Sequence, residues 1–168
     1  GQGSVFTFTA FFTPGQELAA DSGLGRSAPL ELSGLRVLMV EDNDLNSELM
    51  LSFLDQSGIQ AQRAHNGREA LDILAREGFD FILMDIQMPE MDGVAATEHI
   101  RHSDGLSVPR DIPIIAMTAH AMKGDRERLL AQGMDGYISK PISLESLLDE
   151  IRRCLDHASA EPETPTTG

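Results

Sequence analysis

Five polar residues, each directly after a short apolar run, have types and positions that could do chemistry together: Glu41, Asp42, Asp85, Thr118 and Lys140. Taken singly, each could be a turn residue, a strand-end hydroxyl or a solvated charge. Three carboxylates brought to one place would repel one another unless a cation offset them. The hard ion Mg²⁺ suits such a carboxylate group, and a lone lysine would supply positive charge for an incoming phosphoryl group. The set therefore predicts phosphoryl transfer.

The elements that must position these residues alternate between strands and helices. The expected strands are Leu35–Val40, Ile59–Ala64, Phe79–Met84, Ile114–Thr118 and Gly136–Ser139, of which the first and third are nearly continuous apolar runs. Helix-length amphipathic segments follow them, around Leu45–Gln56, Arg68–Ala75, Val94–His102 and Lys123–Ala131, with a fifth after Ser143 as its N-cap. Five such units predict an α/β fold with a parallel sheet covered on both faces. The ends of its strands would gather the five polar residues at one edge.

Composition excludes several classes of protein. The chain has 168 residues, and 13 Lys and Arg against 27 Asp and Glu give a net charge of −14. We therefore expect no nucleic-acid partner and no direct membrane contact, because phosphate backbones and anionic lipids repel such a chain. A lone cysteine, Cys154, cannot form an internal disulfide, which favours a cytoplasmic location. The full-length parent could still be anchored in a membrane.

Several motifs make the chain resemble the receiver domains of two-component response regulators. They are VEDND at 40–44, AHNGREAL at 64–71, FILMDIQMPEMDG at 81–93, IIAMTAHA at 114–121 and GMDGYISKPI at 133–142. The resemblance covers about residues 35 to 155. It implies a flavodoxin-like, doubly wound fold with five helices and a five-stranded parallel sheet of strand order 2-1-3-4-5.

The resemblance also implies roles for the residues of the site. Asp85 matches the aspartate that accepts the phosphoryl group. Glu41 and Asp42 match the acidic pair that binds Mg²⁺ together with Asp85, and the backbone carbonyl of Gln87 completes that site. Lys140 matches the phosphate-binding lysine, which the family holds before a proline through a cis peptide bond.

Further matching positions imply a switch. Thr118 matches the hydroxyl that moves toward the phosphoryl group, and Tyr137 matches the aromatic residue that turns inward in response. The face that changes is built from the fourth helix, the fifth strand and the fifth helix. Gln87 and His120 match positions that influence how fast water removes the phosphoryl group.

The ends of the chain suggest a wider context. Residues 1–13 resemble the last strand of the ATP-binding domain of sensor histidine kinases, and residues 14–33 have the composition of a linker. We expect the receiver domain to span 34–156 and residues 157–168 to be a disordered tail. This order indicates the receiver of a hybrid histidine kinase. Its partners would be the phosphohistidine of its own or a partner kinase core and a histidine phosphotransfer protein.

Two other functions stay open at this stage. Asp42-Asn43-Asp44 after a strand imitates the paired aspartates of Mg²⁺-dependent haloacid-dehalogenase-like phosphatases. Against that reading, Asn46 stands where those enzymes usually have Thr or Val, and no acidic motif follows Lys140 at a later strand end. The other alternative is a degenerate receiver that acts only as a binding module. This chain has no recognisable nucleotide site, so a kinase activity would belong to its parent.

Overall fold

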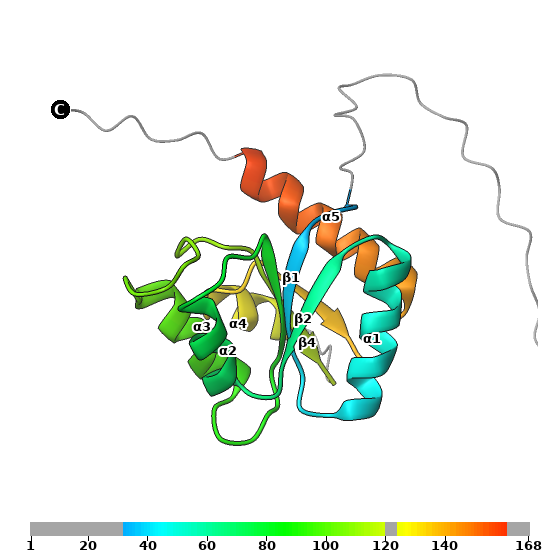
Figure 1. Ribbon diagram of the computed structural model, residues 1–168. Helices are drawn as coiled ribbons and strands as arrows, with labels where there is room; N and C mark the ends of the chain where they lie inside the picture. The colour runs from blue at the N-terminus through cyan, green and yellow to red at the C-terminus, as the bar shows by residue number, and fades with distance from the viewer. Residues whose placement is uncertain (1–31, 120–123, 161–168) are drawn as a thin grey trace, which may run out of the picture.

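The computed structural model describes residues 32–119 and 124–160, which form one parallel sheet with helices on both faces (Figure 1). The strand order is β2-β1-β3-β4-β5, which confirms the predicted fold class. The expected kinase-derived strand at 1–13, most of the expected linker, His120 and the chain after 160 lie outside the described residues.

Strands and helices alternate strictly along the described chain. The strands are β1 (Arg36–Val40), β2 (Gln60–Ala64), β3 (Phe81–Asp85), β4 (Ile114–Thr118) and β5 (Gly136–Ser139). The helices are α1 (Asp44–Gln56), α2 (Gly67–Leu74), α3 (Gly93–His102), α4 (Asp125–Ala131) and α5 (Leu144–Ala160). Each strand and helix begins within two residues of its predicted first residue.

Two apolar cores lie on the two faces of the sheet. On one face, α2, α3 and α4 pack against side chains such as Leu38, Ile82 and Ile114. On the other, α1 and α5 pack against alternate residues of the same strands, including Met39 and Leu83. Figure 1 shows these two helix layers on opposite sides of the strands. All five residues of β3 and of β4 are buried, because helices cover both of their faces.

Side-chain caps fix where the helices begin. Asn43, Asn66 and Asp92 each accept a hydrogen bond from the backbone N–H three residues later, at the starts of α1, α2 and α3. The predicted cap of α5 is confirmed, since the Ser143 hydroxyl accepts from the backbone N–H of Ser146 at 3.2 Å. The caps follow β1, β2 and β3 closely, so these helix starts lie near the site edge of the sheet.

The described structure includes residues on both sides of the span 34–156 that we expected for the receiver domain. Leu32, in the expected linker, is buried in the core beneath α1 and α5. The turn after it is held by a hydrogen bond from the Gly34 N–H to the carbonyl of Gly58. Helix α5 continues to Ala160, past the expected boundary at 156. Leu155 is buried in the core, and the next three residues of the helix are exposed. Among the described residues, no helix has the length and apolar content needed to cross a membrane.

Candidate functional site

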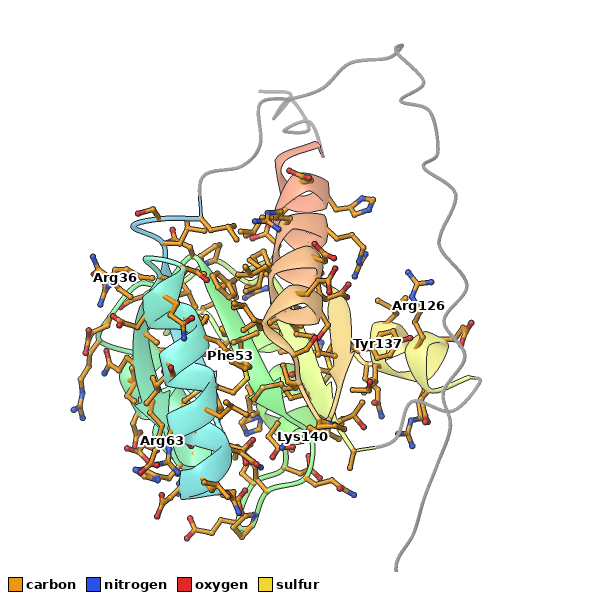
Figure 2. The ribbon with its side chains drawn as sticks, turned by 90° about the vertical axis from the view of Figure 1, so that its right-hand side faces the viewer. Arg36, Phe53, Arg63, Arg126, Tyr137 and Lys140 are labelled. Atoms are coloured by element: carbon orange, nitrogen blue, oxygen red, sulfur yellow. The ribbon has the colours of Figure 1, made fainter. Side chains whose placement is uncertain are left out.

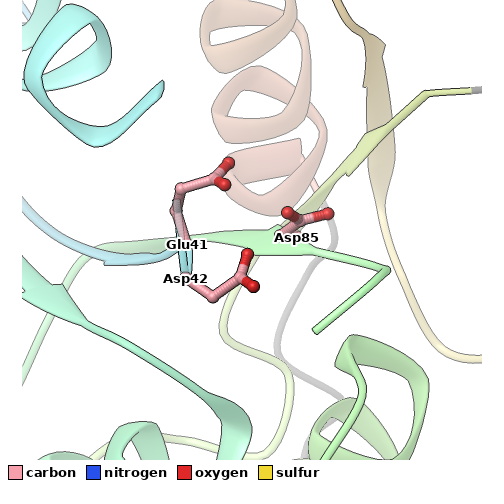
Figure 3. Close-up of side chains that lie close together, drawn as sticks. All are labelled: Glu41, Asp42 and Asp85. Atoms are coloured by element: carbon pink, nitrogen blue, oxygen red, sulfur yellow. The ribbon is translucent and has the colours of Figure 1, made fainter. Parts of the chain in front are cut away.

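The carboxyl ends of the strands bring the predicted polar residues to one edge of the sheet. Glu41 and Asp42 follow β1, Asp85 is the last residue of β3, Thr118 ends β4, and Lys140 follows β5. One carboxylate oxygen from each of Glu41, Asp42 and Asp85 lies within 4.8 Å of the others. Figure 3 shows these three side chains pointing toward one another from the ends of β1 and β3.

Lys140 joins the two buried carboxylates. Its Nζ donates to Asp85 Oδ2 at 2.6 Å and to Glu41 Oε2 at 2.7 Å. Glu41 is 1% exposed and Asp85 is 4% exposed, whereas Asp42 lies in solvent. One ammonium therefore neutralises only part of the negative charge, and the cluster retains an excess of carboxylate.

Burial and the hydrogen bonds of Lys140 have opposing effects on the pKa values at this edge. It raises the pKa of Asp85, and the charge of Glu41 adds to this effect, while hydrogen bonds from Lys140 and from the Gln87 N–H oppose it. Burial lowers the pKa of Lys140, but the hydrogen bonds to Asp85 and Glu41 outweigh burial, so that its pKa is raised overall. The lysine thus stays charged beside an aspartate whose ionised form is disfavoured.

The N-terminus of α3 packs directly against the end of β3, and only glycine fits there. A Cβ on Gly93 would overlap the backbone carbonyl of Asp85 and approach the Met84 side chain. The Gly93 N–H donates to the carbonyl of Ile86 at 3.3 Å, just after the strand. Gly93 is the last residue of the motif at 81–93 but was predicted to have no role of its own, although the Asp92–Gly93 pair before a helix was a visible signal.

The acidic turn after β1 is held by three residues that were not predicted to be part of the site. Asn46 Nδ2 and the Asn43 N–H both donate to Glu41 Oε1 at 3.2 Å. Arg63, near the end of β2, donates to the backbone carbonyls of Glu41 and Asp42. Its position next to the end of the neighbouring strand was the signal that could have identified it.

The expected switch residues occupy adjacent strands. Thr118 is buried at the end of β4, and its carbonyl accepts from the Lys140 N–H at 2.7 Å. Tyr137 is half-buried on β5, pairs with Ala116 in the sheet and packs against the core under α4. Gln87 is exposed and follows Asp85 by two residues. The Lys140–Pro141 peptide bond is cis.

The carboxylate cluster has the chemistry of a site for a hard divalent cation. Its donors are all oxygens, and two of the three carboxylates are buried, unlike solvated acidic groups at an ordinary surface. Their remaining negative charge is a second reason to expect a cation here.

Comparison with known proteins decides the family. The family model described as Response regulator receiver domain matches residues 37–152. The chain belongs to this family. Receiver domains accept phosphoryl groups from histidine kinases or phosphotransfer proteins in two-component signalling. Membership of this family sets aside the phosphatase alternative.

Individual receiver proteins agree with this result. The polar-differentiation response regulator DivK of Brucella anthropi is 45% identical over 122 residues, covering 73% of this chain and 97% of DivK. Among solved structures, the receiver domain of sensor histidine kinase PA1611 from Pseudomonas aeruginosa PAO1, with a magnesium ion in its active-site cleft, is 35% identical. The match has a TM-score of 0.66 and covers 74% of this chain and 99% of that domain. The signal receiver domain of a histidine kinase from Syntrophus aciditrophicus is 30% identical, with a TM-score of 0.65, covering 80% and 99%.

Proposed function

We propose that Asp85 of this receiver domain accepts a phosphoryl group from a phosphohistidine. An Asp85 carboxylate oxygen would attack phosphorus in line, the P–N bond would break, and the imidazole would leave as the P–O bond forms. The observation that carries this proposal is the position of Asp85, buried at the end of β3 with its Oδ2 2.6 Å from Lys140 Nζ. Because phosphohistidine is already activated, the site needs chiefly alignment and charge neutralisation.

The other residues of the cluster would neutralise charge. Glu41, Asp42 and Asp85 would hold Mg²⁺ with the backbone carbonyl of Gln87, and the ion would stabilise negative charge on the phosphoryl oxygens. The magnesium ion in the cleft of the PA1611 receiver supports this assignment. Lys140 would supply the second positive charge, since it already contacts the acceptor carboxylate.

Phosphorylation would then act as a switch. It adds about −1.5 to −2 charges at Asp85, with oxygens that can accept a hydrogen bond from Thr118. Movement of Thr118 would let Tyr137 turn inward, because the two residues lie on neighbouring strands, β4 and β5. The change would be transmitted to the surface formed by α4, β5 and α5. Gln87 and His120 would tune the loss of the phosphoryl group to water.

We also propose that the parent protein is a hybrid histidine kinase and that this domain works in the cytoplasm. Support comes from receiver domains of two histidine kinases, 35% and 30% identical to this chain. The donor would be the phosphohistidine of its own or a partner kinase core, and a histidine phosphotransfer protein would receive the group. DivK, the 45% identical relative, is by its name a response regulator, so a separate receiver is the competing arrangement.

The test is transfer of labelled phosphate from a phosphohistidine-bearing kinase core in the presence of Mg²⁺. We expect label on the wild-type chain, removable by hydroxylamine as an acyl phosphate, and none on Asp85→Asn. Asp92→Asn is the matched control, because asparagine also caps a helix and Asp92 is the cap of α3. We expect Lys140→Ala to bind Mg²⁺ but to accept phosphate poorly.

Labelling of Asp85→Asn at the wild-type rate would refute the assignment of the acceptor. If the wild-type chain bound the phosphorylated kinase core but gained no label, the domain would instead be a degenerate receiver that acts only as a binding module.

A further inference from the structure

Arg63 ties the acidic turn to the neighbouring strand. Its Nε donates to the carbonyl of Glu41 and its Nη2 to the carbonyl of Asp42, both at 3.1 Å. Its Nη1 forms an ion pair of 2.8 Å with the exposed Asp44. The Arg63 side chain is only 18% exposed, although it lies at the edge of the sheet. Figure 2 shows Arg63 at the same end of the molecule as Lys140.

These contacts fix the backbone of the turn rather than its carboxylates. The Glu41 side chain is held separately by Lys140 and Asn46. Asp42 is exposed, so the position of its carboxylate depends on the backbone from which it projects. The guanidinium of Arg63 uses three separate nitrogens in a fixed planar fork, one for each of the two carbonyls and one for Asp44. A lysine has a single nitrogen and cannot occupy these three donor positions.

We infer that Arg63 is a positioning residue for the cation site. By holding the carbonyls of Glu41 and Asp42, it keeps the Asp42 carboxylate within the 4.8 Å cluster of oxygens. The inference rests on the proposed function, in which this cluster binds Mg²⁺. Residues that orient metal ligands typically change metal affinity about 10-fold to 100-fold when they are replaced.

The positive charge of Arg63 should weaken Mg²⁺ binding, whereas its positioning of the turn should strengthen it. The direction in which affinity changes on substitution therefore distinguishes the two effects. A guanidinium near the cluster repels a divalent cation, so its removal should tighten Mg²⁺ binding if charge were its only effect. If Arg63 acts by positioning, Arg63→Gln weakens binding although a positive charge is lost. Arg63→Lys also weakens binding, although the charge is kept.

The experiment follows backbone amide signals of residues 41–44 by NMR during a titration with MgCl₂ alone. We expect the dissociation constant to rise about 10-fold in both Arg63→Gln and Arg63→Lys. Asp44→Asn removes only the exposed ion pair and should change the dissociation constant for Mg²⁺ by less than about twofold. Arg36→Lys is the matched control at the opposite end of the sheet, where Arg36 donates to the carbonyl of Gly78. It should leave Mg²⁺ affinity unchanged.

Unchanged affinity in Arg63→Lys, or tighter binding in Arg63→Gln, would overturn the positioning role while leaving the proposed function intact. Absence of Mg²⁺ binding by the wild-type chain would overturn both. Thermal melting of each variant without Mg²⁺ distinguishes a loss of Mg²⁺ affinity from a loss of folding stability. The two variants Arg63→Lys and Arg36→Lys could also melt at the same temperature, below that of the wild type, and lose Mg²⁺ affinity equally. That result would show general destabilisation and would refute the positioning role.

Discussion

At the scale of single residues, the site is a compromise between burial and charge. Asp85 and Glu41 are almost fully buried, and a single ammonium, that of Lys140, bridges them. Breaking such a buried arrangement by removing one partner is costly, whereas a neutral replacement of similar shape can be harmless or stabilising. The ionised site is therefore a place where stability is given up for function.

The first prediction concerns Asp85→Asn without Mg²⁺. Its raised pKa means that folding favours the neutral carboxyl. Ionisation therefore costs stability progressively as the pH rises above 3.8, and the full cost is reached above the pKa of the folded state. At pH 7 the free energy of unfolding of the variant, measured in urea, should be higher than that of the wild type by about 1 kcal/mol, the size of a typical single-substitution effect. The difference should vanish as the pH falls below the model-peptide value of 3.8, where both states hold the proton. A variant less stable than wild type at pH 7 would contradict this.

The second prediction concerns the thiol of Cys154. Burial raises its pKa to about 12, with Glu150 and Asp135 adding to the effect against the opposing charge of Arg153. Against the ordinary value of 9.0, the reactive thiolate is about a thousandfold scarcer at pH 8. A disulfide reagent such as DTNB should therefore react slowly with the native protein and rapidly in guanidinium chloride. Native and unfolded rates within tenfold of each other would disprove it.

At the scale of elements, the site depends on how closely helices approach the strand ends. Gly93 lets α3 begin in contact with the backbone of Asp85, and Gly136 lets α5 lie against β5, where a Cβ would meet Arg153 Nη2 at 2.9 Å. The contact at Gly93 sets how closely α3 approaches the acceptor. A larger residue there would displace α3 or the end of β3, and with it Asp85, without altering any residue of the cluster.

The third prediction follows for Gly93→Ala. The added methyl would overlap the carbonyl of Asp85, and backbone cannot move aside as a flexible side chain can. We expect a loss of about 2 kcal/mol or more in urea unfolding at pH 7. Gly105→Ala is the control, because its nearest heavy atom would be Ser103 Oγ at 3.9 Å. Equal stability of the two variants would argue against close packing at this point.

The fourth prediction concerns α1, which begins beside the site. Leu45 is 75% exposed and Leu49 is 49% exposed. Leu49 and Met50 border a small cavity of about 80 Å³ that also touches Lys140 and Ile142. If a protein delivers the phosphoryl group, as proposed above, these exposed apolar side chains are available for contact with it.

Replacing Leu45 and Leu49 together by alanine should slow phosphoryl transfer from a phosphorylated kinase core about tenfold in kcat/KM. Phosphorylation by a small-molecule donor should not change, because such a donor needs no docking surface. Leu130→Ala on α4, another exposed leucine at 39%, is the control and should behave as wild type. Equal losses with both kinds of donor would point to damage of the site itself.

At the scale of the whole molecule, two cores hold the five strands in register and so hold the site edge together. The fifth prediction is that Mg²⁺ stabilises the entire fold, because it binds a cluster that exists only when β1 and β3 are paired. A concentration one hundred times the dissociation constant should add about 2.7 kcal/mol. Thermal melting across a MgCl₂ titration measures this, with NaCl at matched ionic strength as the control. Identical melting temperatures in the two salts would contradict it.

Much of this protein could be predicted from the order of residues along the chain. Apolar runs such as Phe81–Met84 need cover on both faces, and their alternation with amphipathic segments leaves few arrangements other than a parallel sheet. Residues directly after such strands must then meet at one edge, so Glu41, Asp85 and Lys140 could be grouped without coordinates. The caps at Asn43 and Ser143 follow from local chemistry in the same way.

Only the tertiary structure decided the contacts that depend on distances between separate elements. Packing between separate strands and helices decides which carboxylates Lys140 bridges, why α3 must begin with Gly93, and what Arg63 holds. The same is true of Leu32, which lies in the expected linker and is buried in the core. Periodicity reports which face of an element is buried, but it carries no measure of how near two buried faces lie.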